Sequence, residues 1–177
     1  MYIVVGLGNP GTEYSLTRHN TGRLAITFLS KKETKNVKLV HLETFMNKSG
    51  SGVAKVIKSK LGARKLVVIY DDLDLPIGSL KMSYDRGSGG HKGIESIIKA
   101  LGTREFIRLR VGISPVTPGG KLKKPSGDKD VEKFILGEFS KKEKEILESV
   151  FKKVAEAVEL ISTETLSTAM TRVNSVK

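Results

Sequence analysis

The stretch that decides the fold is MYIVVGLGNPGTEYSLTRHNTG, residues 1–22. It opens with the apolar run MYIVVGL, after which glycine and proline predict that a buried strand ends in a loop. Within it, GLGNPG (6–11) matches the G-x-G-x-x-G pattern of dinucleotide-binding turns. This turn either holds a nucleotide cofactor or places Asn9, with the downstream His19, for a different chemistry.

The surrounding sequence argues against a nucleotide cofactor. A dinucleotide fold needs an acid about 20 residues further on, at the end of the second strand. The candidate here is Glu33 in KKETKN, which is not a strand end, and Pro10 breaks the turn that would lead directly into a helix. We therefore expect no nicotinamide or flavin site, and we expect the glycines to allow a tight turn that presents Asn9.

Strand-like and helix-like segments alternate along the rest of the chain. Strands are predicted at 37–42, 65–72, 78–84 and 106–114, and helices at 21–32, 51–62, 93–102 and 140–161. This alternation predicts a single compact α/β domain over 1–177, with a central mixed, mostly parallel sheet flanked by helices.

More specific expectations apply to two segments, one of these helices and one of the connections between elements. The helix at 51–62 should place Val53, Val56, Ile57 and Leu61 on one face and end at Gly62. The segment 114–130 is rich in glycine, proline and lysine and lacks periodicity. It is either a mobile basic lid over a site or a plain surface connection.

The composition narrows the class of protein. Lysine and arginine number 31 against 19 acidic residues, a net charge of +12 that attracts polyanions such as nucleic acid. A basic surface that only maintains solubility is the alternative. The absence of cysteine excludes disulfides, thiolate metal sites and cysteine nucleophiles. With no apolar run near the ~20 residues of a membrane span and no secretion signal, a cytoplasmic protein without membrane contact is expected.

Polar residues follow several of the predicted strands. Asn9, Asn47 and Asp71 come at or after strand ends, and His19 lies on the long first loop. Sites of open α/β sheets form beyond the carboxyl ends of the strands. If these ends converge, the site contains one imidazole, one carboxylate and two carboxamides.

Such a set suits acid–base chemistry. A histidine of ordinary pKa, about 6.5, accepts a proton near neutral pH. A carboxylate on its second nitrogen fixes the tautomer and stabilises the imidazolium, and asparagines hold water or donate to an oxyanion. Because G-x-S-x-G is absent, water activated by His19 is the simplest nucleophile and ester hydrolysis the simplest reaction.

Other interpretations of these motifs remain open. His19 can be a helix cap or a core hydrogen-bonding residue, and DDLDLP (71–76) can be a solvated turn or a Mg²⁺ site. RGSGGHKG (86–93) is either a phosphate-binding nest or a flexible loop. The three histidines, at positions 19, 41 and 91, are scattered, so no transition-metal cluster is expected.

Six motifs are distributed in order along nearly the whole sequence: GLGNPGTEYSLTRHNTG, TFMNKSG, YDDLDLPIG, GSGGHKGIESI, FIRLRVGI and VEKFILGEF. Together they resemble the bacterial-type peptidyl-tRNA hydrolase family. The resemblance implies a monomeric α/β enzyme that cleaves the ester between a peptide and the terminal ribose of tRNA, and so recycles tRNA. It implies no metal, no organic cofactor and no obligate protein partner.

The resemblance also implies roles for individual residues. His19 matches the general base and Asp71 the acid that supports it. Asn9 and Asn47 match the site carboxamides, of which Asn9 is implicated in telling N-blocked substrates from free aminoacyl-tRNA. Further residues match positions that bind the tRNA end, the peptide or the tRNA phosphates: Tyr14, Phe45, Met46, His91, Lys92, Lys81 and Arg110. The segment 114–130 matches a mobile flap over the cleft.

Two features depart from the family pattern. Lys92 stands where the family usually has asparagine, and a lysine donates hydrogen bonds but cannot accept them. Residues 21–44 are fewer than the family's helix-plus-hairpin segment, so either this member is trimmed there or the sequence omits a stretch.

Two rival functions follow from these observations. A non-catalytic RNA-binding relative is opposed by the intact asparagine, histidine and aspartate set but left open by Lys92. A Mg²⁺-dependent phosphohydrolase would use DDLD, residues 71–74, and would be sensitive to a chelator.

Overall fold

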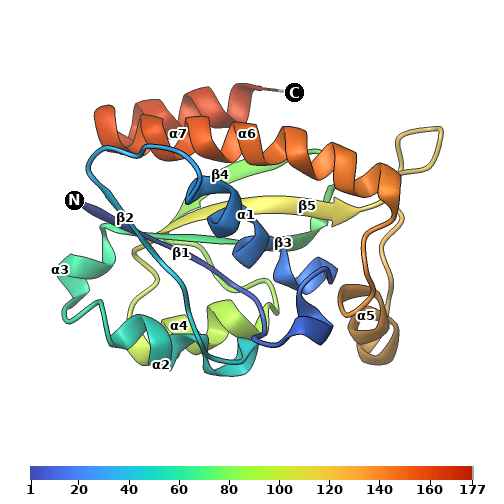
Figure 1. The fold of residues 1–177 in the computed structure, drawn as a ribbon, viewed down its shortest axis with the longest axis horizontal. Helices are drawn as coiled ribbons and strands as arrows, with labels where there is room; N and C mark the ends of the chain where they lie inside the picture. The colour runs from blue at the N-terminus through green and yellow to red at the C-terminus, as the bar shows by residue number, and fades with distance from the viewer. Residues whose placement is uncertain (177) are drawn as a thin grey trace.

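The computed structural model describes residues 1–176, which fold around one five-stranded sheet in the order β2-β1-β3-β5-β4 (Figure 1). The strands are β1 (Tyr2–Gly6), β2 (Val37–Val40), β3 (Leu66–Pro76), β4 (Leu80–Tyr84) and β5 (Ile107–Ser114). Neighbours among β2, β1, β3 and β5 pair in parallel, and β4 pairs antiparallel with β5 at the edge. The prediction of a single compact α/β domain with a mixed, mostly parallel sheet is confirmed.

Helices cover both faces of the sheet. The α-helices are α1 (Thr21–Leu29), α2 (Ser49–Ala54), α3 (Lys60–Ala63), α4 (Lys92–Leu101), α5 (Asp128–Ile135), α6 (Lys141–Thr163) and α7 (Leu166–Ser175). Short 3-10 turns are η1 (Thr12–Tyr14), η2 (Arg18–Asn20) and η3 (Met46–Lys48). Helices α1, α6 and α7 lie on one face and α2 and α4 on the other, and each layer encloses its own apolar core (Figure 1).

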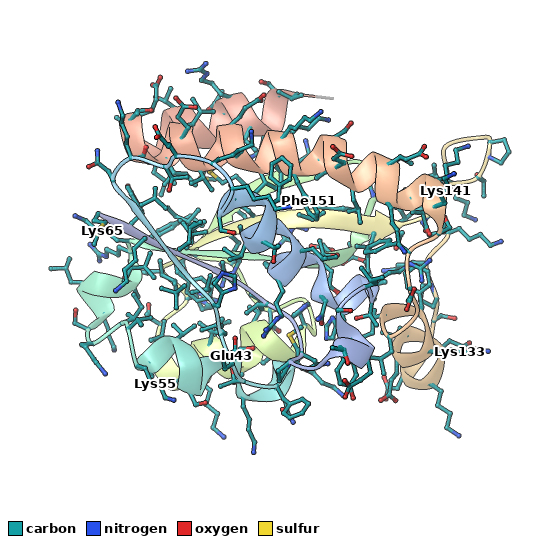
Figure 2. All side chains as sticks on the ribbon, viewed as in Figure 1. Glu43, Lys55, Lys65, Lys133, Lys141 and Phe151 are labelled. Carbon is teal, nitrogen blue, oxygen red and sulfur yellow. The ribbon has the colours of Figure 1, made fainter. Side chains whose placement is uncertain are left out.

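Burial from both sides explains the apolar strands. All eight residues of β5 are buried, including Arg108 and Arg110. On the α6 face, the ring of Phe151 packs 5.9 Å from that of Phe28 in α1. The excess of lysine is spread over the surface, and Lys55 and Lys133, for example, extend from different sides of the molecule (Figure 2).

The prediction of a single helix at 51–62 was wrong. The structure has two short helices there, because the hydroxyl of Ser59 accepts a hydrogen bond from the backbone N–H of Gly62 and starts α3 anew. Leu61 is 74% exposed instead of joining the apolar face, and α3 ends at Ala63 rather than at Gly62.

Other boundaries also differ from expectation. Strand β3 continues through DDLDLP, and Asp71 and Asp72 pair with β5, so this motif is not a solvated turn. Helices α5 and α7 were not predicted, and α5 begins at Asp128, inside the segment 114–130. Within the remainder of that segment Val116 pairs with Leu122.

The first glycine of GLGNPG allows α1 to pack directly against the sheet. A Cβ atom on Gly6 would overlap the carbonyl of Gly22, and one on Gly22 would overlap the backbone of Leu7 and Ile69. Only glycine allows so close an approach between a helix and two strands. The same contact holds the loop between β1 and α1 above the carboxyl ends of β1 and β3.

The segment 21–44 contains α1 and the edge strand β2, which pairs with β1 from Tyr2 opposite Val37 to Val5 opposite Val40. The long helix expected at 140–161 is α6, started by Ser140 and Glu143 in a capping box. Among residues 1–176, no helix combines the length and the apolar composition needed to cross a bilayer.

Candidate active site

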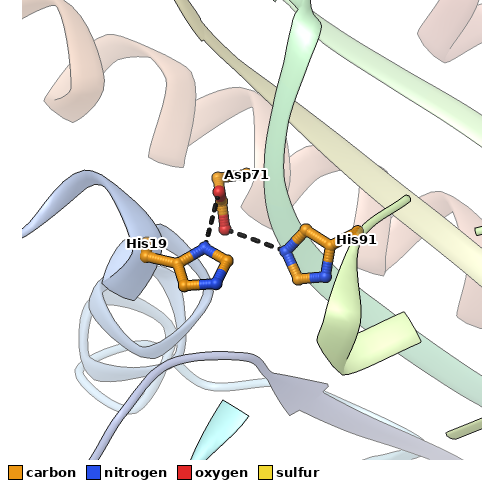
Figure 3. Close-up of side chains that lie close together, drawn as sticks. All are labelled: His19, Asp71 and His91. Atoms are coloured by element: carbon orange, nitrogen blue, oxygen red, sulfur yellow. Dashed lines mark hydrogen bonds and ion pairs between the residues drawn. The ribbon is translucent and has the colours of Figure 1, made fainter. Parts of the chain in front are cut away.

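One buried carboxylate lies between two histidines at the carboxyl edge of the sheet (Figure 3). Asp71 Oδ2 lies 2.9 Å from Nδ1 of His19, and Asp71 Oδ1 lies 3.2 Å from Nε2 of His91. The two imidazole ring centres are 5.0 Å apart. The expectation that the histidines are scattered was therefore wrong for two of the three, because β3 and the start of α4 bring His91 beside His19. His41 is exposed and outside this cluster.

The hydrogen bonds set the tautomers of both rings. His91 is the N-cap of α4, and its Nδ1 accepts the N–H of Ile94 at 3.4 Å, so Nε2 carries the proton donated to Asp71. An ionised carboxylate only accepts, so Nδ1 of His19 also carries a proton. The Nε2 atom of His19 therefore keeps its lone pair for a substrate or a water.

The cluster shifts the pKa values of its members. Burial alone would raise the pKa of Asp71, but the two adjacent imidazoles outweigh burial and hold that pKa well below its usual range. Burial alone would lower the pKa of His19, but the charge and hydrogen bond of Asp71 outweigh it, so the pKa of His19 is raised from 6.5. Lys92 opposes this increase with its own positive charge. Asp71 is thus a stable anion that favours protonation of His19.

The side chain of Asn9 has a defined orientation. Its Oδ1 accepts a hydrogen bond from the backbone N–H of Met46 at 2.8 Å. The Nδ2 group is consequently the part of this side chain that remains to donate to a ligand. Asn47 is exposed on η3, one residue after Met46.

An open cleft of about 730 Å³ contains the cluster. Its lining includes all of the site residues predicted from the sequence except Lys81: Asn9, Tyr14, His19, Phe45, Met46, Asn47, Asp71, His91, Lys92 and Arg110. Lys81 instead donates to the backbone carbonyl of Asn174 on α7, at 2.8 Å. Arg110 lines the cleft, but its Nε donates to Asp72 at 2.7 Å, which neutralises part of its charge.

Sequence reasoning did not single out two residues that flank His19. The side chain of Asn20 hydrogen-bonds to the backbone of Asn9, and the side chain of Arg18 contacts Phe134 in α5 and Glu143 in α6. Both belong to the motif TRHNTG, so their adjacency to His19 was the available signal. Arg86, on the loop before α4, also lines the cleft.

The donor set does not favour a metal centre. Ligand atoms of His19, Asp71 and His91 lie within 4.8 Å of one another. A metal on Nε2 of His91, however, would have to displace the proton that Ile94 fixes there. The DDLD carboxylates are also engaged, since Asp72 pairs with Arg110 and Asp74 with Lys124. The three side chains of the cluster are instead joined by the hydrogen bonds of Asp71 to the two imidazoles.

Comparisons with known proteins, by family model, sequence and structure, all match one family. A family model described as peptidyl-tRNA hydrolase matches residues 3–177. The peptidyl-tRNA hydrolase of Thermotoga maritima is 40% identical over 191 residues, which cover 99% of this chain and 98% of that protein. That of Carboxydothermus hydrogenoformans is 39% identical over 194 residues, 98% of each chain. A crystal structure of the Acinetobacter baumannii peptidyl-tRNA hydrolase has a TM-score of 0.84 and 27% identity, covering 100% of this chain and 96% of that one.

Fold and site together define an α/β protein with a histidine–carboxylate cluster in an open cleft. The chain belongs to the peptidyl-tRNA hydrolase family. The alignments with these relatives extend over 191 and 194 residues against the 177 of this chain, so the relatives contain residues that it lacks.

Proposed function

We propose that this chain hydrolyses the ester between a peptide, or an N-blocked amino acid, and the terminal ribose of tRNA. Membership of the family and the matching fold support hydrolysis. The observation that carries the mechanism is the 2.9 Å contact between Nδ1 of His19 and Oδ2 of Asp71, which leaves Nε2 of His19 as a base. We further propose that the protein acts as a monomer in the cytoplasm and recycles tRNA from released peptidyl-tRNA.

In this mechanism His19 activates a water molecule. Its Nε2 takes a proton from the water as the oxygen attacks the ester carbonyl, and Asp71 stabilises the imidazolium that forms. Nδ2 of Asn9 donates to the developing oxyanion, and Asn47 helps to hold the water or the carbonyl. When the ester C–O bond breaks, the imidazolium returns the proton to the departing ribose oxygen, and the free carboxylic acid leaves.

The rim of the cleft supports a nucleic-acid end as substrate. The rings of Tyr14 and Phe45 meet edge to face, 6.5 Å apart, and Phe45 is 52% exposed. Such aromatic groups offer a surface on which a base can stack. Lys92 and Arg86 add positive charge for phosphate at the same cleft. Lys81 lies outside the cleft, so we assign it to RNA beyond the reacting end.

Release of an N-acetyl-aminoacyl group from tRNA by the purified protein tests this proposal. We expect release that persists in EDTA and collapses in His19→Ala, but not in His41→Ala, which changes an exposed histidine outside the cleft. Loss of this release in EDTA would instead support a Mg²⁺-dependent hydrolase, and cleavage of a phosphate ester in place of the aminoacyl ester would support the phosphohydrolase. Binding of tRNA without cleavage would favour the non-catalytic RNA-binding relative.

A further inference from the structure

Arg18 lies in the loop between β1 and α1 that also carries His19, here called the catalytic loop. Its side chain joins this loop to a segment more than a hundred residues away in the chain. Its Nη2 lies 3.2 and 3.1 Å from the two carboxylate oxygens of Glu143, and its Nη1 donates to the carbonyl of Phe134 at 3.4 Å. The guanidinium also lies 4.4 Å from the ring centre of Phe134 and 5.4 Å from that of Phe139. The side chain is 14% exposed, so these contacts are largely shielded from water.

The backbone around Arg18 reinforces this junction. The N–H of Arg18 donates to the carbonyl of Gly137 at 3.0 Å, and the N–H of Phe139 donates to the carbonyl of Leu16 at 3.4 Å. Thr17 pairs antiparallel with Glu138 between them. The loop before His19 and the linker between α5 and α6 therefore form a short two-stranded pairing, closed on one side by the Arg18 side chain.

The other partner in this junction is a wall of the cleft. Val131, Glu132 and Ile135 of α5 line the cleft, followed by Leu136. Figure 1 shows α5 beside the short turns of the first loop. No residue of α5 is fully buried, and the helix contacts the apolar core through the partly buried Phe134 and Ile135. The linker that Arg18 holds ties α5 to the loop that carries His19 as well.

We infer that Arg18 is a positioning residue for His19. Its side chain holds the catalytic loop and the α5 wall of the cleft together as one unit. This inference rests on the proposed function for its consequence in catalysis. A substrate lying against α5 then meets His19 at a defined distance, because both are tied to the same guanidinium. A misplacement of about 1 Å in such a constellation costs about a hundredfold in rate.

The test replaces Arg18 by methionine and by lysine in the full chain. Methionine retains the stacking bulk and removes every side-chain hydrogen bond of Arg18, whereas lysine retains one charge contact with Glu143 but not the fork. We expect kcat to fall about tenfold to a hundredfold in Arg18→Met with KM changed about twofold or less, and Arg18→Lys to lie between it and the wild type.

Ser140→Ala is the matched control. It removes the hydroxyl that caps α6 beside Glu143 and destabilises the same region, while the Arg18 carboxylate contact remains. Its kcat should stay near the wild-type value even if its melting temperature falls. An equal loss of kcat in Ser140→Ala and Arg18→Met would overturn the inference.

A second readout does not depend on activity. This readout is an NMR titration of the His19 imidazole in the free protein. In Arg18→Met the pKa of His19 should fall toward 6.5, because the contact with Asp71 loosens. In Ser140→Ala the pKa of His19 should stay unchanged. An unchanged His19 pKa in Arg18→Met would contradict the positioning role.

If the wild type cleaves no peptidyl-tRNA, the proposed function fails while this titration still tests Arg18. If Arg18→Met does not fold, Arg18→Lys and Glu143→Gln provide the same two readouts.

Discussion

Asn20 uses both polar atoms of its side chain to hold the backbone of Asn9. Its Oδ1 accepts the N–H of Asn9 at 2.8 Å, and its Nδ2 donates to the carbonyl of Asn9 at 2.9 Å. Because Asn9 Oδ1 accepts in turn from Met46, the three residues form one chain of hydrogen bonds beside the cleft. The buried Asn20 thus fixes the backbone of Asn9, and the N–H of Met46 orients the Asn9 carboxamide that lines the cleft.

Asn20→Ala should separate this positioning from stability. The loss of two partly buried hydrogen bonds should lower the free energy of unfolding by about 1–3 kcal/mol. It should also lower kcat/KM about tenfold, because Asn9 is no longer held against the reacting carbonyl. Initial rates and urea unfolding measure the two effects. A destabilised variant with wild-type kcat/KM would show that Asn9 needs no such support.

Much of the fold could be predicted because its signals are local. Apolar β-branched runs such as residues 65–70 and glycine stops mark strands and turns without knowledge of the rest of the chain. The clustering of polar residues at strand ends follows from parallel topology. The structure places Asn9, His19 and Asp71 around one cleft, and their catalytic roles stay predictions.

The remaining features depend on contacts distant in sequence. His91 reaches Asp71 because β4 runs antiparallel to β5 and ends opposite Ile107, and residues 85–91 then return the chain to the carboxyl edge of the sheet, where α4 starts. Nothing in the local pattern of 86–93 indicates that pairing. Helix α5 spans only Asp128–Ile135, so its apolar stripe of Val131, Phe134 and Ile135 is too short to stand out in the sequence beside those of the longer helices. Residues 49–63 form two helices because a single hydroxyl, that of Ser59, caps the second one.

His91→Asn should change the pH dependence of the reaction. Asparagine is a good N-cap, so α4 should retain its start, but the donor to Asp71 is lost. The carboxylate charge then acts on His19 alone and raises the pKa of His19 further. We expect the acid limb of the kcat/KM profile to move to higher pH. An acid limb that stays in place or moves to lower pH would contradict this role of His91.

Lys92→Asn tests whether the unusual lysine contacts phosphate. The binding of tRNA should lose about one unit from the slope of log affinity against log salt concentration. Lys99→Asn is the control, because Lys99 is exposed on the same helix but does not line the cleft. Filter binding at several salt concentrations measures both slopes. Equal slopes for the two variants would place Lys92 away from the RNA.

Arg108 is predicted to reduce stability. It is fully buried, and within residues 1–176 none of its three side-chain nitrogens has a hydrogen-bond partner in the protein. Burial lowers its pKa to about 10, and the guanidinium lies 4.2 Å from the ring centre of Phe106. Arg108→Met should raise the free energy of unfolding by about 1–4 kcal/mol in urea. A loss of stability would show that the charge is compensated.

The central claim, that His19 held by Asp71 is the general base, is tested most directly by the pH dependence of kcat/KM in the wild type and Asp71→Asn. In the wild type the rate should rise as His19 loses its proton, with a midpoint above 6.5 because Asp71 raises the pKa of His19. In Asp71→Asn the midpoint should move to lower pH. The plateau should fall by about 10²–10⁴, since asparagine donates to Nδ1 and leaves the proton on Nε2. A wild-type midpoint and plateau in Asp71→Asn would contradict the claim.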